Sequence, residues 1–295
     1  MTTYPAKVNI VEVGPRDGLQ SMEKSIATED KITYLNLLSQ CGFSEIEVTS
    51  FVSPKWIPQL ADAKEVSAKM DRLNGITYTA LVPNLKGLDD ALSAQYSSVA
   101  VFTAASESFS KNNTNCSIDE SMGRFHQMTP VWEEHSLRVR GYISTVWHCP
   151  YEGPIKTGSV IDVIAKILDL GIQNISLGDT IGKATADEVR FTLETILNRW
   201  HPKHFALHMH DTFGFAKENI QAAMEFEINT FDSSTGGIGG CPYAEDASGN
   251  IATENVVSLC NSIGIETGIN EEKLEETSTF IKSIVKKESL AHAKD

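Results

Sequence analysis

The chain has 295 residues, and 25 lysines and arginines against 39 aspartates and glutamates give it a formal net charge of −14 at pH 7. Binding to nucleic acid through bulk charge is disfavoured, because basic side chains are what neutralise phosphates. A content of 41% hydrophobic and 22% charged residues excludes a wholly disordered chain, and the length fits either two small domains or one large α/β barrel.

Eight short segments rich in β-branched and aromatic residues recur at intervals of roughly thirty residues, as in strand–helix units. The segments are Val8–Val13, Glu45–Phe51, Thr77–Pro83, Ser98–Ala104, Leu137–Val146, Asn174–Leu177, His204–Met209 and Ile228–Asp232. The helical patterns between them include Asp30–Gln40, Ile161–Leu170, Ala186–Trp200 and Asn250–Ile263. Without a linker to divide them, the units predict a single domain over residues 1–295, folded as a closed TIM (β/α)8 barrel of the α/β class.

A doubly wound open sheet is the alternative fold. Its usual G-x-G-x-x-G fingerprint is absent after the first strand segment, where the sequence reads Gly14-Pro15-Arg16-Asp17-Gly18. Beyond Ile263 an additional helix is predicted over Glu271–Lys287, within about residues 270–290. Its apolar side is formed by Leu274, Phe280, Ile281 and Ile284. This helix either caps the barrel or packs on a partner.

Several features indicate a cytoplasmic protein. The segment Met1–Lys7 lacks the apolar core of a signal peptide, and no apolar run reaches the roughly 18 residues of a membrane-spanning helix. The five cysteines form no C-x-x-C pair, which suits a reducing compartment. The chain ends in Ala293-Lys294-Asp295, without a peroxisomal signal. We therefore expect no membrane partner.

Polar side chains gather at the predicted carboxyl ends of the strands, where TIM-barrel enzymes have their active sites. They are Arg16, Asp17, Glu47, Ser50, Asp179, Thr180, His208, His210, Asp211, Asn250 and Glu254. His208 and His210 are two residues apart on a strand, so both point to the same face. With Asp17 and Asn250 they form a candidate site for a divalent metal, and a pair of purely structural histidines is the alternative. Nitrogen and oxygen ligands without thiolate favour Mg or Mn, although non-haem Fe(II) also fits.

The remaining candidates each have a functional and a structural interpretation. Arg16 either pairs with an acidic side chain or holds a substrate oxygen that gains charge. Asp179 either takes part in catalysis or caps the next helix. Cys241 follows a run of glycines that predicts a mobile loop over the site, although a single loop cysteine is more often inert. These residues alone indicate a metal-assisted enzyme that acts on a small oxygen-rich molecule.

Eight segments resemble the 3-hydroxy-3-methylglutaryl-CoA (HMG-CoA) lyase family. They are VGPRDGLQ at Val13–Gln20, IEVTSFVSPKW at Ile46–Trp56, LVPNLKG at Leu81–Gly87, NCSIDES at Asn115–Ser121, CPYEG at Cys149–Gly153, ISLGDTIG at Ile175–Gly182, HMHDTFG at His208–Gly214 and GGCPYAEDASGNIATE at Gly239–Glu254. The R-D-G and H-x-H-D elements also occur in Claisen synthases, such as isopropylmalate and homocitrate synthases. The loop around Cys241 is the more specific signature, because it is the lyase's own.

The resemblance implies retro-Claisen cleavage of HMG-CoA to acetyl-CoA and acetoacetate. It implies a divalent metal, Mg or Mn, bound by Asp17, His208, His210 and Asn250. Either Asp179 or His208 would remove the hydroxyl proton, and Arg16 would stabilise the enolate oxygen. Cys241 would return a proton to the carbanion, with Glu47 supporting the acid–base network.

The resemblance also implies an acyl-CoA substrate across the barrel mouth and a homodimer. The expected substrate contacts are Arg16, Gln20, Lys24, Ser50, Asn113, Ser117, Arg140, Tyr142 and His148. A net charge of −14 repels an anionic CoA, so local cations must attract it.

One departure from the family pattern bears on the substrate. Trp147 and His148 precede Cys149, where the family commonly has a glycine just before that cysteine. If these side chains line the pocket, a related 3-hydroxyacyl-CoA such as citramalyl-CoA becomes an alternative substrate; if they rotate away, nothing changes. A Claisen synthase, a non-haem Fe(II) oxygenase and a metal-binding barrel without catalysis are the competing hypotheses for the function.

Overall fold

The computed structural model describes residues 4–22, 25–241 and 244–291. Eight parallel strands close into a barrel in the spatial order β1-β10-β9-β8-β5-β4-β3-β2. Their bounds are β1 (Asn9–Glu12), β2 (Glu45–Ser50), β3 (Thr77–Leu81), β4 (Ser98–Ala104), β5 (Arg138–Ser144), β8 (Asn174–Asp179), β9 (Phe205–Met209) and β10 (Thr230–Ser233). All eight predicted strand segments are confirmed, and so is the TIM barrel.

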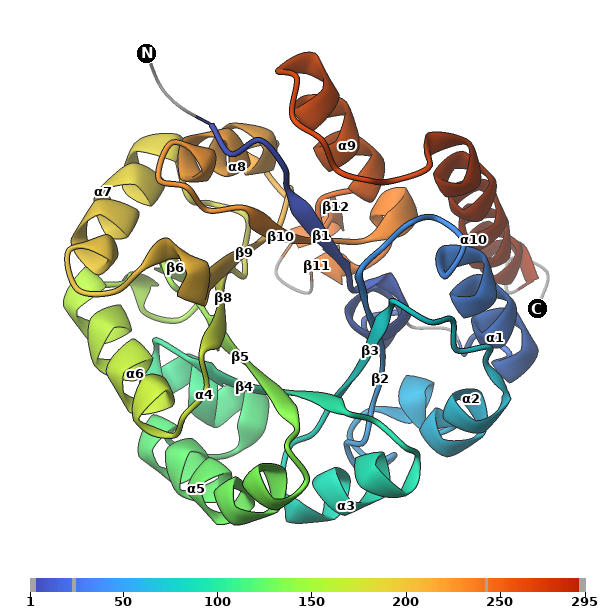
Figure 1. The fold of residues 1–295 in the computed structure, drawn as a ribbon, viewed down its shortest axis with the longest axis horizontal. Helices are drawn as coiled ribbons and strands as arrows, with labels where there is room; N and C mark the ends of the chain where they lie inside the picture. Colours follow the sequence, from blue (N-terminus) through green and yellow to red (C-terminus); the bar gives the residue numbers. More distant parts are fainter. Residues whose placement is uncertain (1–3, 23–24, 242–243, 292–295) are drawn as a thin grey trace.

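The helices form a ring outside the strands (Figure 1). Their bounds are α1 (Thr28–Leu38), α2 (Ala63–Lys69), α3 (Leu85–Ser93), α4 (Glu107–Thr114), α5 (Ile118–Glu134), α6 (Thr157–Asp169), α7 (Ala186–Leu197), α8 (Ala216–Met224), α9 (Thr253–Ser262) and α10 (Glu271–Ala291). Local sequence fixes several helix starts. For example, Ser117 with Glu120 and Thr185 with Glu188 form reciprocal capping boxes at α5 and α7.

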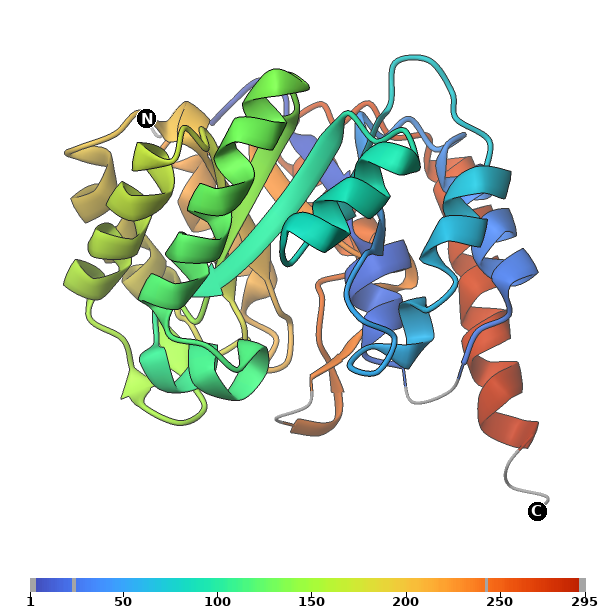
Figure 2. The same cartoon turned by 90° about the horizontal axis from the view of Figure 1, so that it is seen from below.

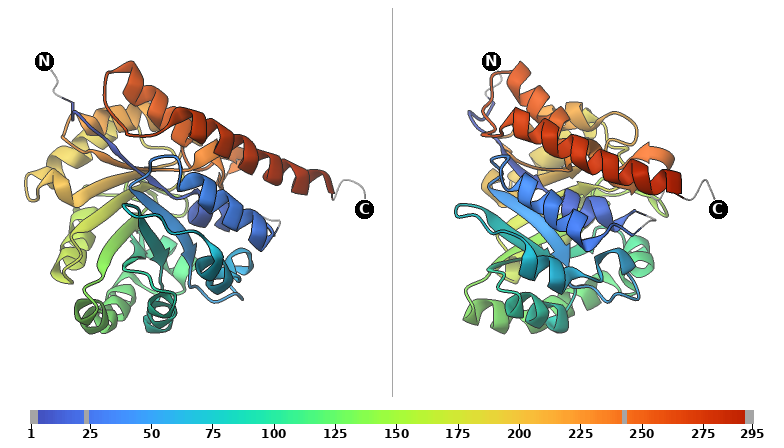
Figure 3. Two further views of the ribbon diagram at one scale, coloured as in Figure 1. Left: turned by 45° about the vertical axis from the view of Figure 1, so that its right-hand side comes forward. Right: turned by 90° about the vertical axis from the view of Figure 1, so that its right-hand side faces the viewer.

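The predicted helix after Ile263 is α10, and its buried residues include Leu274 and Ile281. It packs beside α1 and against the short 3-10 helix η4 (Thr235–Gly237), on the outside of the barrel (Figures 1 and 3). Its carboxyl end extends past the barrel (Figure 2). None of the described helices is long and apolar enough to cross a membrane.

Two short hairpins and two 3-10 turns also belong to the described parts of the chain. Two hairpins, β6 (His148–Cys149) with β7 (Gly153–Pro154) and β11 (Gly240–Cys241) with β12 (Ala244–Ser248), lie at one end of the barrel together with α4 (Figure 2). Two further 3-10 turns are η2 (Pro58–Leu60) and η3 (Pro202–His204). The hairpins follow the carboxyl ends of β5 and β10, so this end is the mouth where a TIM barrel places its active site.

The barrel interior is polar at its centre, whereas the space between strands and helices is apolar. For example, the Thr79 hydroxyl donates to the Glu45 carboxylate at 2.9 Å, and the Ser98 hydroxyl lies 2.9 Å from Thr79 Oγ1 on its other side. By contrast, the strand residues Ile10, Ile143 and Leu207 belong to the apolar core that lies between the strands and the surrounding helices. Strand alternation produces this division, because successive side chains point to opposite faces. Polar inward positions leave the mouth lined by groups that can bind a charged ligand.

Candidate active site

Two strand ends bring three ligating side chains together at the mouth. Asp17 lies in the π-helical turn η1 (Gly14–Gly18) after β1, His208 lies on β9, and His210 follows it. His208 Nε2 lies 3.3 Å from His210 Nε2 and 3.8 Å from Asp17 Oδ2. One ligand atom from each residue falls within 4.8 Å of the others. The two imidazoles thus share one face, as their spacing predicted.

Asn250 joins the same group through Asp17. Its Nδ2 donates a 2.8 Å hydrogen bond to Asp17 Oδ2, and its backbone bridges to His210. An Asn amide can be turned by half a rotation, so that Oδ1 replaces Nδ2 at this place. The structure therefore brings all four predicted metal residues into one cluster.

Close packing fixes the turn that carries Asp17. A Cβ atom on Gly14 would lie 2.4 Å from the Tyr34 hydroxyl and 2.6 Å from Glu12 Oε1, so a larger residue would displace the turn. The Glu12 carboxylate is buried and accepts hydrogen bonds from the backbone N–H of Gly14 at 2.8 Å and of Thr235 at 3.0 Å. Glu12 thereby links the start of η1, which follows β1, to η4, which follows the neighbouring strand β10.

The protonation of His210 and Asp17 suits a cation, whereas His208 has to lose a proton to become a ligand. Burial alone would lower the pKa of His208, but the hydrogen bond to Asp232 and the charges of Asp17 and Asp232 outweigh it and raise that pKa. Burial and the positive charge of His208 lower the pKa of His210 to about 4. Burial alone would raise the pKa of Asp17, but Arg16 and the two histidines outweigh it and hold that pKa well below its usual range. A neutral imidazole and an ionised carboxylate are the forms that bind a divalent metal. In addition, His210 Nδ1 is buried without a hydrogen-bond partner among the described residues.

Arg16 lies beside this group and is held by acidic neighbours. It forms ion pairs with Asp17 and with the buried Glu47. Tyr142 donates a 2.6 Å hydrogen bond to the other Glu47 oxygen, and its ring centre lies 5.5 Å from the Arg16 guanidinium carbon. Despite the cost of burial, the charges of Glu47 and Asp17 raise the pKa of Arg16 still further, so it stays positive.

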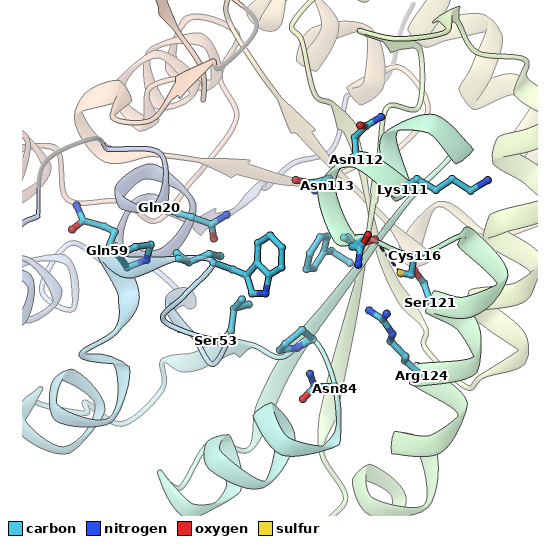
Figure 4. Close-up of a pocket in the computed structure, with 18 of the residues that line it drawn as sticks. Gln20, Ser53, Gln59, Asn84, Lys111, Asn112, Asn113, Cys116, Ser121 and Arg124 are labelled. Atoms are coloured by element: carbon cyan, nitrogen blue, oxygen red, sulfur yellow. Dashed lines mark hydrogen bonds between the residues drawn. The ribbon is translucent and has the colours of Figure 1, made fainter.

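Two cavities open at the mouth. The smaller, of about 210 Å³, is lined by Asp17, His208 and His210 together with Arg16 and Tyr142. The larger, of about 1020 Å³, is the pocket in Figure 4. Both are lined by Gln20, Val52, Ile57, Phe102 and Asn113, so the cavities are neighbours. A ligand could place its reacting end in the smaller cavity and its bulk in the larger one.

The larger cavity contains two cations that the sequence did not single out, Lys111 on α4 and Arg124 on α5 (Figure 4). Both are exposed side chains. Their joint placement depends on how α4 and α5 fold over one end of β4, which no local motif reveals. The only signal in the sequence was their nearness to the predicted contacts Asn113 and Ser117.

Other predicted substrate contacts line neither cavity. Ser50 is buried and its hydroxyl accepts a 3.3 Å hydrogen bond from the Val52 N–H, while Ser117 caps α5. Arg140 is fully buried in the barrel, where it pairs with Asp232. Lys24 lies outside the described residues. These positions leave Arg16, Gln20, Asn113 and Tyr142 as the described predicted contacts at the cavities.

Asp179 and His148 lie close enough for the charge of His148 to act on the Asp179 carboxyl. Both Asp179 oxygens accept backbone N–H groups, from Lys183 at 3.2 Å and Ala184 at 3.0 Å. His148 Nε2 lies 3.0 Å from Glu188 Oε1 on α7, and Trp147 donates to the Glu188 carbonyl at 3.3 Å. Burial raises the pKa of Asp179 to about 6. Neither Asp179 nor His148 lines the two cavities.

Cys241 belongs to the backbone of β11, but its side chain lies outside the described residues. Gly239 directly precedes this hairpin. A Cβ on Gly239, which has a φ of +115°, would lie 2.8 Å from Asn250 Nδ2. Only glycine therefore allows this part of the chain to pass so close to the metal group.

Comparison with known proteins agrees with this arrangement. The family model described as HMGL-like matches residues 7–281. A cytoplasmic 3-hydroxy-3-methylglutaryl-CoA lyase of Rattus norvegicus is 47% identical over 287 residues, which cover 97% of this chain and 84% of that protein. A mitochondrial hydroxymethylglutaryl-CoA lyase of Macaca fascicularis is 47% identical over 281 residues, which cover 95% of this chain and 86% of that protein.

Solved structures give the same result. The HMG-CoA lyase of Brucella melitensis superposes with a TM-score of 0.94 at 43% identity, covering 96% of this chain and all of that chain (100%). An HMG-CoA lyase of Acinetobacter baumannii, in complex with coenzyme A and 3-methylmalate, has a TM-score of 0.91 at 37% identity. This match covers 97% of this chain and 93% of that chain.

Proposed function

The chain belongs to the HMGL-like family, and from this membership we propose that it is a carbon–carbon lyase that cleaves HMG-CoA to acetyl-CoA and acetoacetate. The observation that carries the proposal is the small cavity in which Asp17, His208 and His210 meet beside Arg16, next to a larger cavity of about 1020 Å³. The alternative substrate citramalyl-CoA is not favoured, because His148 faces Glu188 and lines neither cavity.

We propose Mg or Mn as the ion, held by Asp17, His208, His210 and Asn250. Oxygen and nitrogen donors without a thiolate among the described ligands support this choice. When bound, the ion supplies Lewis acidity that polarises the substrate hydroxyl and carboxylate.

His208 is favoured over Asp179 as the group that takes the hydroxyl proton. His208 lines the smaller cavity, whereas both Asp179 oxygens are engaged by backbone N–H groups. Nε2 is the nitrogen that faces the cavity, because Nδ1 lies 3.3 Å from Asp232. Its single lone pair holds either the ion or the proton, so while His208 carries the proton the ion would be held by Asp17, His210 and Asn250. As the proton leaves the hydroxyl, its oxygen becomes the ketone oxygen of acetoacetate. The bond between the hydroxyl-bearing carbon and the α-carbon of the thioester breaks, and its electron pair passes into the thioester enolate.

Arg16 then stabilises the enolate oxygen of the departing acetyl-CoA. Its guanidinium lines the smaller cavity and is fixed by Glu47 and Tyr142 before any substrate arrives. The Arg16 guanidinium therefore does not have to change position as negative charge develops on the enolate oxygen. Glu47 therefore acts as a positioning residue.

Cys241 is proposed as the acid that transfers the thiol proton to the enolate carbon. The close approach of Gly239 to Asn250, which leads the chain toward Cys241 beside the metal group, supports this role. Replacement Cys241→Ala should lower turnover by orders of magnitude and leave the metal content intact. Near-normal turnover would exclude the role.

The CoA portion is assigned to the larger cavity, where Lys111 and Arg124 supply local positive charge against the net charge of −14.

A single catalytic domain, a cytoplasmic location and a homodimer complete the proposal. Four described cysteines, Cys41, Cys116, Cys149 and Cys260, are free, which suits a reducing compartment. The end of α10 that extends past the barrel is a candidate dimer contact (Figure 2), and light scattering tests the dimer.

Calorimetric titration of the metal-free protein with Mn²⁺ tests the proposed metal site. One site is expected in the wild type, with at least tenfold weaker binding after His210→Ala. His126→Ala, which removes an exposed histidine from α5, is the matched control and should bind as the wild type does. Equal affinity in all three proteins would contradict the ligand assignment.

A further inference from the structure

A series of buried polar contacts crosses the barrel interior beneath the metal group. Arg140 on β5 reaches across to β10, where its Nη2 lies 2.6 Å from Asp232 Oδ1. The second oxygen, Asp232 Oδ2, lies 3.3 Å from His208 Nδ1 and accepts a 2.7 Å hydrogen bond from Ser176. The Arg140 and Asp232 side chains are both 0% exposed, and neither lines a cavity described above.

The register of two neighbouring strands fixes the contact between Asp232 and His208. These residues are directly paired on the parallel strands β10 and β9. Paired residues of adjacent strands point to the same face of a sheet, which here is the barrel interior. With Nδ1 turned toward Asp232, His208 Nε2 faces His210 and Asp17.

The chemistry of the pair selects one form of the imidazole. An ionised carboxylate only accepts hydrogen bonds, so the hydrogen of a neutral His208 must lie on Nδ1 and the lone pair on Nε2. Arg140 stabilises this arrangement, since a buried carboxylate without a compensating charge is strongly disfavoured. His210 differs, because its Nδ1 has no such partner in the part of the chain that is described.

We infer that Asp232, paired with Arg140, is a positioning residue that fixes the tautomer and ring orientation of His208, so that affinity for the divalent ion depends on two residues that touch neither ion nor substrate. This inference rests on the metal site proposed above. On this inference the tautomer and ring orientation of His208 are fixed before the ion binds, whereas those of His210 are not, because its Nδ1 has no partner among the described residues. Partners of this kind typically change metal affinity by about 10- to 100-fold when they are replaced.

The variant Asp232→Asn keeps the shape of the side chain and removes its charge. Calorimetry with Mn²⁺, without substrate, should show affinity about 10- to 100-fold weaker than that of the wild type. Ser176→Ala is the matched control, because it removes another contact to the same Asp232 oxygen but leaves the carboxylate facing His208. We expect its affinity to stay within about threefold of the wild type.

The tautomer of His208 can be measured directly, and it would not change if Asp232 only stabilised the fold. Nitrogen NMR of ¹⁵N-histidine-labelled, metal-free protein should show His208 protonated at Nδ1 in the wild type and as a mixture of tautomers in Asp232→Asn, with His208→Gln identifying the signal. If Asp232→Asn fails to fold, the double variant Arg140→Gln with Asp232→Asn restores charge balance in the barrel. It should show the same loss of affinity.

The outcomes separate the two proposals. A wild type that binds no Mn²⁺ would overturn the metal site and this inference with it. A wild type that binds Mn²⁺, together with a folded Asp232→Asn protein of equal affinity and unchanged tautomer, would overturn the positioning role alone.

Discussion

The Arg16 guanidinium carbon lies 5.5 Å from the centre of the Tyr142 ring, and the two side chains bond opposite oxygens of the same Glu47 carboxylate. Arg16 is therefore held from two directions while it still lines the smaller cavity. A cation fixed before the substrate binds is what stabilisation of a developing enolate charge requires.

Replacement of Arg16 should act on turnover. We expect Arg16→Gln to lower kcat by about 100- to 1000-fold, because the enolate oxygen loses a positioned donor. Arg16→Lys retains the charge without the planar fork that reaches Glu47 and Asp17, and it should recover only part of the loss. Steady-state release of acetyl-CoA measures the effect, and Mn²⁺ titration shows whether the metal site is intact. A folded Arg16→Gln protein with kcat within tenfold of the wild type would contradict the role.

Arg124 should act on binding alone. Since it is exposed and lines the larger cavity, Arg124→Gln should raise KM for the acyl-CoA by about three- to tenfold and leave kcat unchanged. The increase should shrink at high salt, which screens exposed charges. Arg199→Gln, an exposed cation near the end of α7 that lines neither cavity, is the matched control. Equal changes in KM for both variants would argue against a CoA site in this cavity.

His148 should not determine the substrate. Because it pairs with Glu188, we expect His148→Gly to leave the ratio of kcat/KM for HMG-CoA and citramalyl-CoA unchanged within about twofold. Loss of this partly buried contact should lower the free energy of unfolding by about 1 kcal/mol or less. Gln20→Ala serves as the positive control, since Gln20 lines both cavities and its buried Oε1 has no partner among the described residues. If the ratio of kcat/KM for the two substrates changed in the His148 variant and not in the Gln20 variant, His148 would be the residue that determines the substrate.

Asp179 should make stability depend on pH. Burial raises its pKa from 3.8 to about 6, so folding favours the protonated carboxyl. Its contribution to stability is greatest below about pH 4 and is lost as the pH rises through 6, by up to about 3 kcal/mol. Asp179→Asn lacks this dependence. Denaturant unfolding of both proteins from pH 4 to 8 should show the wild type losing stability relative to the variant between pH 4 and 6. A constant difference would show that the carboxyl is not perturbed.

The barrel was predictable because each strand–helix unit carries its own hydrophobic pattern. The metal cluster was predictable for a similar reason, since the spacing of His208 and His210 fixes their common face and the fold brings strand ends together. Arg140 was predicted as a substrate contact and instead lies inside the barrel. It is the third residue of β5, well before the mouth, and its partner Asp232 lies 92 residues away in the sequence.

Contacts between distant segments account for the other differences. The side chain of His148 is directed by α7, which begins almost forty residues later, and no local pattern encodes that approach. Lys111 and Arg124 become neighbours of one cavity only after α4 and α5 fold against the mouth. Such positions depend on tertiary packing, whereas strands and strand-end residues follow from periodicity.

Metal-dependent cleavage of HMG-CoA can be measured on the purified protein by incubation with the substrate and Mn²⁺, with mass spectrometry of both products. We expect acetyl-CoA and acetoacetate in equal amounts, loss of both on removal of the metal with a chelator, and recovery on its return. In D₂O the acetyl group should gain one deuterium, because a solvent-exchanged acid protonates the enolate carbon. Intact HMG-CoA after incubation with the metal-loaded protein would contradict the proposed activity.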